Sequence, residues 1–109
     1  MSDNKIVSLF TESIAVKNKF LESKQVENLA AIGEVAVDSI INGGKLIFCG
    51  NGCSAADVQH IAVDMLVSLR PNYNRESIPA FALSQYTSII TACGNDYGYD
   101  NLYSRLLSS

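Results

Sequence analysis

The sequence predicts an α/β fold with a small parallel sheet, and three observations carry that prediction. Two short apolar runs, residues 45–49 and 80–83, are bounded by glycine, proline or polar residues, as buried strands usually are. Residues 55–69 lie between them and space their apolar side chains as a helix does. Two strands joined by a helix form a βαβ unit, in which the strands should be parallel and the connection right-handed.

Two longer helices are expected before the first strand. Apolar residues recur at helical spacing over residues 4–23 and again over 25–42. An asparagine and two glycines at 42–44 then end the second helix, because glycine readily adopts the left-handed conformation of a helix end. We expect residues 1–44 to form an N-terminal helical hairpin whose apolar stripes pack against other copies of the chain. Residues 45–109 would then form the first part of the α/β domain.

The remaining residues predict a loop and two short helices. Residues 70–77 form a polar loop, and residues 87–93 a helix that ends at Gly94. A polar turn at 95–98 leads to a last helix that runs through Leu107. Two parallel strands are too few for a stable open sheet. Because the sequence ends where another strand is expected, we expect either the front half of a larger domain or a sheet completed by a partner chain.

The composition argues against several classes of function. Eight basic residues are scattered among eleven acidic ones, with a net charge of -3, so no basic patch suggests nucleic acid as a partner. No apolar run reaches the ~20 residues of a membrane span, and the polar amino terminus is unlike a secretory signal. Cys49, Cys53 and Cys93 predict no disulfide framework, and packed thiols are favoured over a metal or redox site. We therefore expect a cytoplasmic protein that binds neither nucleic acid nor membranes.

The junction between the first strand and the next helix is the candidate binding site, and it reads Gly50-Asn51-Gly52-Cys53-Ser54. Glycine lets the backbone approach a ligand closely, and the first amides of a helix have no internal partners. The helix dipole adds a partial positive charge. With the side chains of Asn51 and Ser54 as further donors, the loop suits a phosphate group, although Ser54 could instead only cap the helix. The lysine of nucleotide loops and the third glycine of dinucleotide loops are both missing.

The helix after this loop carries a polar face. Asp57, His60 and Asp64 fall together on the helical wheel. The opposite, core-facing side is expected to hold Val58, Ala62, Met65, Leu66 and Leu69. His60, the single histidine, and Asp64 lie one turn apart and could form a proton-transfer pair or supply two metal ligands. An ordinary solvated pair is the alternative, and spacing alone favours it.

These residues resemble the sugar isomerase (SIS) domain family. The motif that runs from Gly50-Asn51-Gly52 through Ser54-Ala55-Ala56-Asp57 to Gln59-His60 is similar to that family's first phosphate loop and helix. The strings LFTESI, INGGK and GNDYGYDNLYSR are further matches. The likeness extends to bacterial phosphoheptose isomerases, which convert sedoheptulose 7-phosphate to a heptose 7-phosphate for lipopolysaccharide synthesis. A non-enzymatic relative of the same fold, which binds the chromosomal replication initiator, shares part of the pattern and is the alternative.

The resemblance implies roles for individual residues. The substrate-binding residues that it implies are Asn51, Gly52, Cys53, Ser54 and Asp96. His60 matches a zinc-binding histidine, and Asp64 falls where the isomerases have a glutamate that serves as catalytic base and metal ligand. The implied chemistry is aldose–ketose interconversion through an enediol, with zinc as the implied cofactor. The implied assembly is a homodimer or homotetramer.

The sequence departs from the family pattern at several positions. Cys53 replaces a usual glycine, Asp64 is one methylene shorter than glutamate, and Ser68 lies where arginine is common. The family's second phosphate loop and a later histidine have no counterpart in residues 1–109. We therefore expect a parent protein that is an isomerase, of which this chain holds the front half of the site and is inactive alone.

Overall fold

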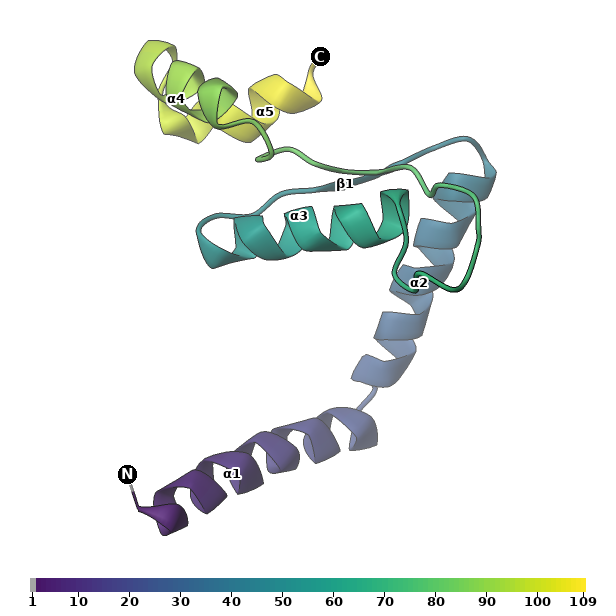
Figure 1. Ribbon diagram of the computed structural model, residues 1–109, viewed down its shortest axis with the longest axis vertical. Helices are drawn as coiled ribbons and strands as arrows, with labels where there is room; N and C mark the ends of the chain where they lie inside the picture. Colours follow the sequence, from purple (N-terminus) through teal and green to yellow (C-terminus); the bar gives the residue numbers. More distant parts are fainter. Residues whose placement is uncertain (1) are drawn as a thin grey trace. The chain divides into compact units, whose positions relative to one another are not determined.

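The computed structural model describes residues 2–109, and the chain divides into two compact units between Asp38 and Ser39 (Figure 1). In chain order the elements are α1 (Asp3–Glu22), α2 (Gln25–Ile41), β1 (Leu46–Phe48), α3 (Cys53–Leu66), β2 (Ala80–Ala82), α4 (Thr87–Asp96), η1 (Tyr99–Asn101) and α5 (Leu102–Leu107). The predicted α/β class, with helices before the first strand, is confirmed.

The two N-terminal helices expose their apolar faces. Neither α1 nor α2 has a buried residue, and Phe10 of α1 is 68% exposed. The helices are separated at Ser23, whose hydroxyl accepts a hydrogen bond from the Gln25 amide at 3.2 Å. Among the described residues α1 and α2 do not pack against each other, so the side-by-side contact expected of a hairpin is not formed.

The end of α2 follows the predicted glycine stop. Gly43 has a φ of 81°, in the left-handed region. Its amide donates to the Ile40 carbonyl at 3.1 Å, and the Gly44 amide donates to the Ser39 carbonyl at 2.7 Å. These two bonds form a Schellman motif, which satisfies carbonyls that the helix itself leaves unpaired.

The sheet consists of β1 and β2, which pair in parallel as predicted. Leu46 lies opposite Ala80, and Phe48 lies opposite Ala82. Helix α3 runs alongside the strands, with α4 and α5 on their other side (Figure 1). Ala62 of α3 and both alanines of β2 are buried, because small side chains allow the helix to approach the sheet closely.

Helix α4 is longer than predicted. It continues through Gly94 to Asp96, so the prediction that Gly94 ends it is wrong. The chain turns instead at Gly98, whose φ is 85°. Glycine permits the left-handed conformation without requiring it, so packing decides which glycine turns. Here Leu102, which is 1% exposed, anchors the segment after the turn.

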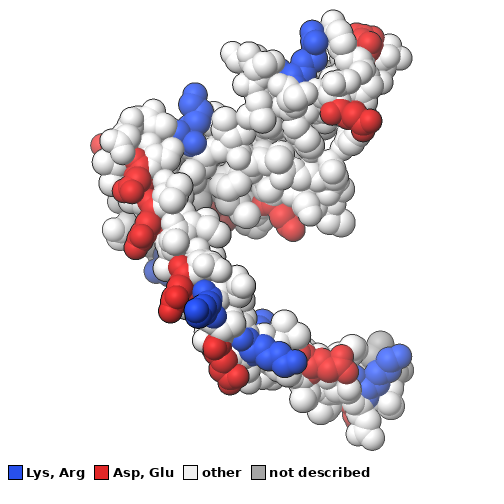
Figure 2. Space-filling view, turned by 180° about the vertical axis from the view of Figure 1, so that it is seen from behind, with Lys and Arg blue, Asp and Glu red and all other residues white. Residues whose placement is uncertain are grey.

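Charged side chains of both signs alternate along the N-terminal helices on the face that Figure 2 shows. Much of the rest of this face carries neither sign (Figure 2). Among residues 2–109, no helix combines the length and apolar character that crossing a membrane requires.

Candidate functional site

The two glycines of the loop after β1 have different structural roles. Gly52 is the N-cap of α3 and has a φ of 58°, which residues with a Cβ rarely adopt. Helix α3 therefore begins at Cys53, two residues earlier than predicted. A Cβ on Gly50 would lie 2.8 Å from the Ser54 carbonyl carbon, so the chain passes directly against the first turn of α3. The loop is as tight as the sequence predicted, and both glycines are needed for it.

At the start of α3, two backbone amides are free. Within the described chain, the amides of Gly52 and Cys53 donate no hydrogen bond. The Ser54 amide is not free, because it donates to the Asn51 carbonyl at 3.1 Å. The N-cap is Gly52, and within the described chain the Ser54 hydroxyl makes no hydrogen bond, so Ser54 does not cap the helix. Two amides and one exposed hydroxyl, at the positive end of a 14-residue helix, are donors suited to an anion.

Two tyrosines that the sequence analysis missed contact this loop. The Tyr103 hydroxyl lies 2.5 Å from the Gly50 carbonyl oxygen and 3.0 Å from Oδ1 of Asn51. The Tyr99 hydroxyl also donates to Oδ1 of Asn51. Burial, and then the neighbouring Tyr99, raise the pKa of Tyr103, which favours the protonated form that donates these bonds. Their four-residue spacing, which places both on one side of a helical turn, is the sequence signal that could have revealed them.

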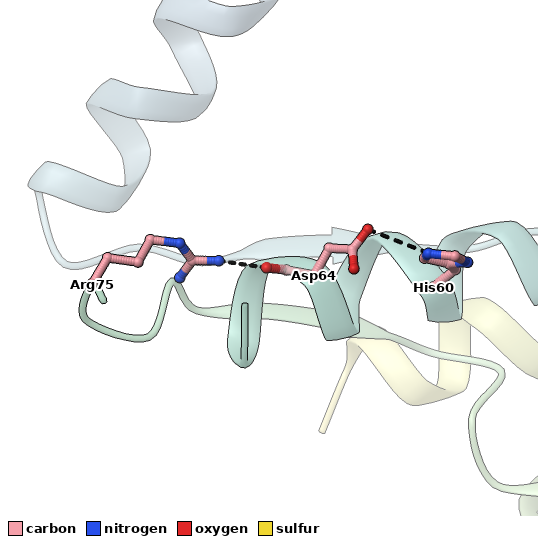
Figure 3. A network of polar contacts seen from close by, with 3 residues as sticks. All are labelled: His60, Asp64 and Arg75. Carbon is pink, nitrogen blue, oxygen red and sulfur yellow. Dashed lines mark hydrogen bonds and ion pairs between the residues drawn. The ribbon is translucent and has the colours of Figure 1, made fainter. Parts of the chain in front are cut away.

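The predicted pairing of His60 and Asp64 is present on α3 (Figure 3). Nε2 of His60 lies 3.4 Å from Oδ2 of Asp64. The His60 side chain is 77% exposed, whereas that of Asp64 is 28% exposed. Asp57, also expected on this face, is exposed. One imidazole is thus open to a ligand while its carboxylate partner is partly sheltered, which suits a proton-transfer pair.

Arg75 closes the far end of α3, and sequence reasoning did not identify it. Its guanidinium donates to the Asp64 carbonyl (Figure 3). It also donates to the Met65 carbonyl at 2.7 Å. The Ile78 amide donates to the same Met65 carbonyl at 3.1 Å. With these carbonyls occupied the helix ends at Leu66, and Leu69, predicted in its core face, is 66% exposed. Arg75 therefore anchors the backbone that carries Asp64.

The carboxyl edge of the sheet adds a buried hydroxyl to the site region. Ser84 follows β2, and within the described chain its buried Oγ has no hydrogen-bond partner. Nε2 of Gln59, on α3, donates to the Ser84 carbonyl at 3.2 Å. Carboxyl ends of parallel strands meet at one edge, where ligands of α/β sheets bind. Ser84 therefore lies at the same sheet edge as the loop after β1.

The structure does not bring Asp96 to this loop through any described hydrogen bond. Its carboxylate accepts a bond from Nδ2 of Asn95 at 2.8 Å. It lines a pocket of about 300 Å³ between α4 and α5. Asp96 therefore belongs to a different local environment from the loop and from the His60–Asp64 pair.

A parallel sheet whose carboxyl edge meets a glycine-rich loop, free helix amides and an imidazole–carboxylate pair defines an α/β domain suited to phosphorylated ligands. The chain belongs to the SIS domain family, because the family model described as "SIS domain" matches residues 9–108. The resemblance found in the sequence is thereby confirmed.

Curated relatives and solved structures agree on one kind of protein. The chain is 41% identical over 107 residues to a phosphoheptose isomerase of Leptospira biflexa, covering 98% of this chain and 54% of that protein. It is 43% identical over 100 residues to one of Roseiflexus sp., covering 92% of this chain and 49% of that protein. The chain thus spans about half the length of the curated relatives it matches.

The fold matches solved structures of the same name. A phosphoheptose isomerase from Neisseria gonorrhoeae superposes with a TM-score of 0.82 and 35% identity, covering 96% of this chain and 52% of that one. One from Francisella tularensis gives 0.86 and 31% identity, covering 100% of this chain and 56% of that one. The chain is therefore similar to these isomerases in both sequence and fold.

Proposed function

We propose that the chain is the front part of a phosphoheptose isomerase, a parent protein that interconverts sedoheptulose 7-phosphate and a heptose 7-phosphate. The observation that carries the proposal is that one helix, α3, has free amides at its start and a His60–Asp64 pair along its length. The relatives named phosphoheptose isomerase support the choice of substrate. The substrate-binding residues in this proposal are Asn51, Gly52, Cys53 and Ser54. Asp96, which the resemblance also implies, lines the pocket between α4 and α5 and is not assigned a contact with the phosphate.

The spacing along α3 suits a ligand with a charged end and a reacting end. His60 lies seven residues beyond Cys53, which is about 10 Å along the axis at ~1.5 Å per residue. A phosphate held by the Gly52 and Cys53 amides therefore leaves His60 facing carbons remote from the phosphate. In a 7-phosphate sugar the reacting carbons, C1 and C2, are at that remote end.

The proposed reaction moves protons between neighbouring carbons. A base takes a proton from C1 while the C2 carbonyl oxygen gains one, which forms an enediol. Loss of the O1 proton and protonation of C2 then give the aldose, with no net change in composition. We assign the base to Asp64, with His60 as the proton carrier beside it, because their side chains lie 3.4 Å apart. Arg75 keeps the backbone at Asp64 in place.

Zinc accepts the donor types of His60 and Asp64, one imidazole nitrogen and one carboxylate. A tetrahedral site needs at least one more protein ligand. Residues 2–109 hold no group of three His, Cys, Asp or Glu side chains that could share an ion. The residues of this chain therefore do not fit a complete zinc site, and no step of the proposed reaction is assigned to zinc.

Self-assembly is part of the proposal, with residues 1–44 as the packing segment and residues 45–109 as the first part of the SIS domain. Its support is the exposed apolar surface of α1 and α2, whose helices have no buried residue. Such surface on a helix is normally covered by protein. We infer a homodimer or homotetramer, which light scattering would report as a mass two or four times that of the chain. A monomer at micromolar concentration would contradict this inference.

We assign the reaction to the cytoplasm. Cys49, Cys53 and Cys93 are free thiols, a state that the reducing cytoplasm maintains. Exposed thiols such as Cys49 and Cys53 would be prone to oxidation elsewhere. Residence of the native protein in a soluble cell fraction after spheroplasting would support the assignment.

The test is turnover of sedoheptulose 7-phosphate by the full-length parent protein and by its Asp64→Asn variant. The variant should lose at least a hundredfold in kcat, as expected for removing a base, while still binding the sugar phosphate. Glu76→Gln is the matched control, since this exposed carboxylate lies near the same end of α3 and takes no part in the proposed chemistry. Full activity in Asp64→Asn would contradict the assignment of the base. Binding without turnover in the unaltered parent protein would instead favour a non-catalytic SIS protein, such as one that binds the replication initiator.

A further inference from the structure

Tyr99 and Tyr103, hereafter the tyrosine pair, join the end of the chain to the loop after β1. Their hydroxyls both donate to Oδ1 of Asn51, and the Tyr103 proton is shared with the Gly50 carbonyl. These bonds link residues 48 to 53 positions apart in the sequence. The tyrosine pair therefore acts on the loop through Asn51 and Gly50 and makes no bond to the free amides.

The two bonds determine which end of the Asn51 side chain is available. A side-chain amide has one oxygen that accepts and one NH2 group that donates. With Oδ1 held by two hydroxyls, the NH2 group is the end left for a ligand, and within the described chain it donates to nothing. Together with the Gly52 and Cys53 amides it forms a set of donors only. Such a set favours an anion, because no acceptor of the loop would repel the phosphate oxygens.

The segment that carries the tyrosine pair is itself anchored. Leu102, between the two tyrosines, is almost fully buried. Nδ2 of Asn101 donates to the Tyr97 carbonyl at 2.7 Å, which closes the turn at Gly98. The hydroxyls are thus presented from a packed turn and short helix, so little conformational freedom remains to be lost when they hold Asn51.

We propose that Tyr99 and Tyr103 are positioning residues for phosphate binding, which hold Asn51 so that its NH2 group, and not its oxygen, meets the ligand. This inference rests on the proposed function, since it assigns a role within the same sugar-phosphate site. The donating hydroxyls have to be protonated, as a phenol with its usual pKa of about 10 is at neutral pH, and burial raises the pKa of Tyr103 further.

The experiment, made in the full-length parent protein, compares Tyr99→Phe, Tyr103→Phe and the control Tyr97→Phe by calorimetric titration with sedoheptulose 7-phosphate. Phenylalanine keeps each ring and removes only the hydroxyl. Each of the first two changes should weaken binding by about 3- to 10-fold, the usual effect of losing a neutral hydrogen bond. Tyr97→Phe should bind within twofold of the unaltered protein, because the Tyr97 ring stacks on Arg105 at 3.6 Å and within residues 2–109 its hydroxyl has no hydrogen bond.

Two further measurements separate positioning from general support of the fold. In an Asn51→Ala background, the tyrosine changes should weaken binding no further, because they act through Asn51. In steady-state assays they should raise KM and leave kcat within twofold, since the phosphate contact is the same in the ground and transition states. If the tyrosine changes instead loosened α3 as a whole, His60 and Asp64 would also be displaced and kcat would fall.

The possible results test the inference and the proposed function separately. Unchanged affinity in Tyr99→Phe and Tyr103→Phe overturns the inference and leaves the proposed function standing. The inference is also overturned if the tyrosine changes weaken binding just as much in the Asn51→Ala background, or if they lower kcat and leave KM unchanged. An unaltered protein that binds neither sedoheptulose 7-phosphate nor inorganic phosphate overturns the proposed function, and the inference with it.

Discussion

Replacing Gly50 with alanine should destabilise the start of α3. An added Cβ would lie 2.8 Å from the carbonyl carbon of Ser54, 2.9 Å from its carbonyl oxygen and 3.0 Å from its Cβ. Two of these three atoms belong to the backbone, so no rotation of a flexible side chain can relieve the overlap. The first turn of α3 has to move away from β1, and forced overpacking of this kind costs about 1–3 kcal/mol.

The measurement is thermal unfolding followed by circular dichroism. A loss of about 2 kcal/mol corresponds to a fall in Tm of roughly 8 °C, at ~4 °C per kcal/mol for a domain of about 100 residues. Gly94→Ala is the control, because Gly94 lies within α4 and a Cβ there meets no atom within 4 Å. Alanine should stabilise that helix position by about 0.5–1 kcal/mol. A Gly50→Ala protein as stable as the unaltered one would refute the close passage of the loop against α3.

Three further predictions concern single residues. Arg75→Ala should lower the free energy of unfolding by about 1–2 kcal/mol, since charged donors to two carbonyls are lost. Arg70→Ala is the control and should have no effect. Equal urea midpoints for the two variants would contradict the role of Arg75 at the end of α3. Gly43→Ala should cost about 1–2 kcal/mol because of its left-handed φ, and an unchanged Tm would argue against the helix stop. Because its pKa is raised in the fold, Tyr103 should stabilise the protein below the unfolded pKa of about 10 and lose this contribution as pH rises through the folded pKa. Urea unfolding from pH 8 to 11 should show a steeper fall in the free energy of unfolding than in Tyr103→Phe. The same pH dependence in both proteins would exclude this contribution of Tyr103.

The elements that the sequence predicted correctly are those encoded by local patterns. Helical spacing identified α1, α2 and α3, and short apolar runs identified both strands. The helix between the strands indicated that they are parallel. The stop at residues 42–44 depends on one conformational property of glycine, so it too was readable. The His60–Asp64 contact follows from four-residue spacing on a single helix, a geometry that needs no knowledge of the rest of the fold.

The errors arose where distant contacts compete with local preference. Helix α3 ends at Leu66 because Arg75 and Ile78, from the following loop, occupy its last carbonyls. Gly98 rather than Gly94 turns the chain, although both are glycines and either could adopt the required φ. A local pattern shows what a residue is able to do, and the packing of its neighbours selects among the possibilities.

By itself the sequence determined the order and type of the elements, the tight glycine loop and the polar face of α3. Only the tertiary structure decided which amides of the loop stay free and which side chains hold it. The bond from Tyr103 to Gly50 spans 53 residues, and no periodicity of the intervening sequence encodes it. Periodic patterns follow from the geometry of one helix or strand, whereas such a bond depends on how separate elements pack together.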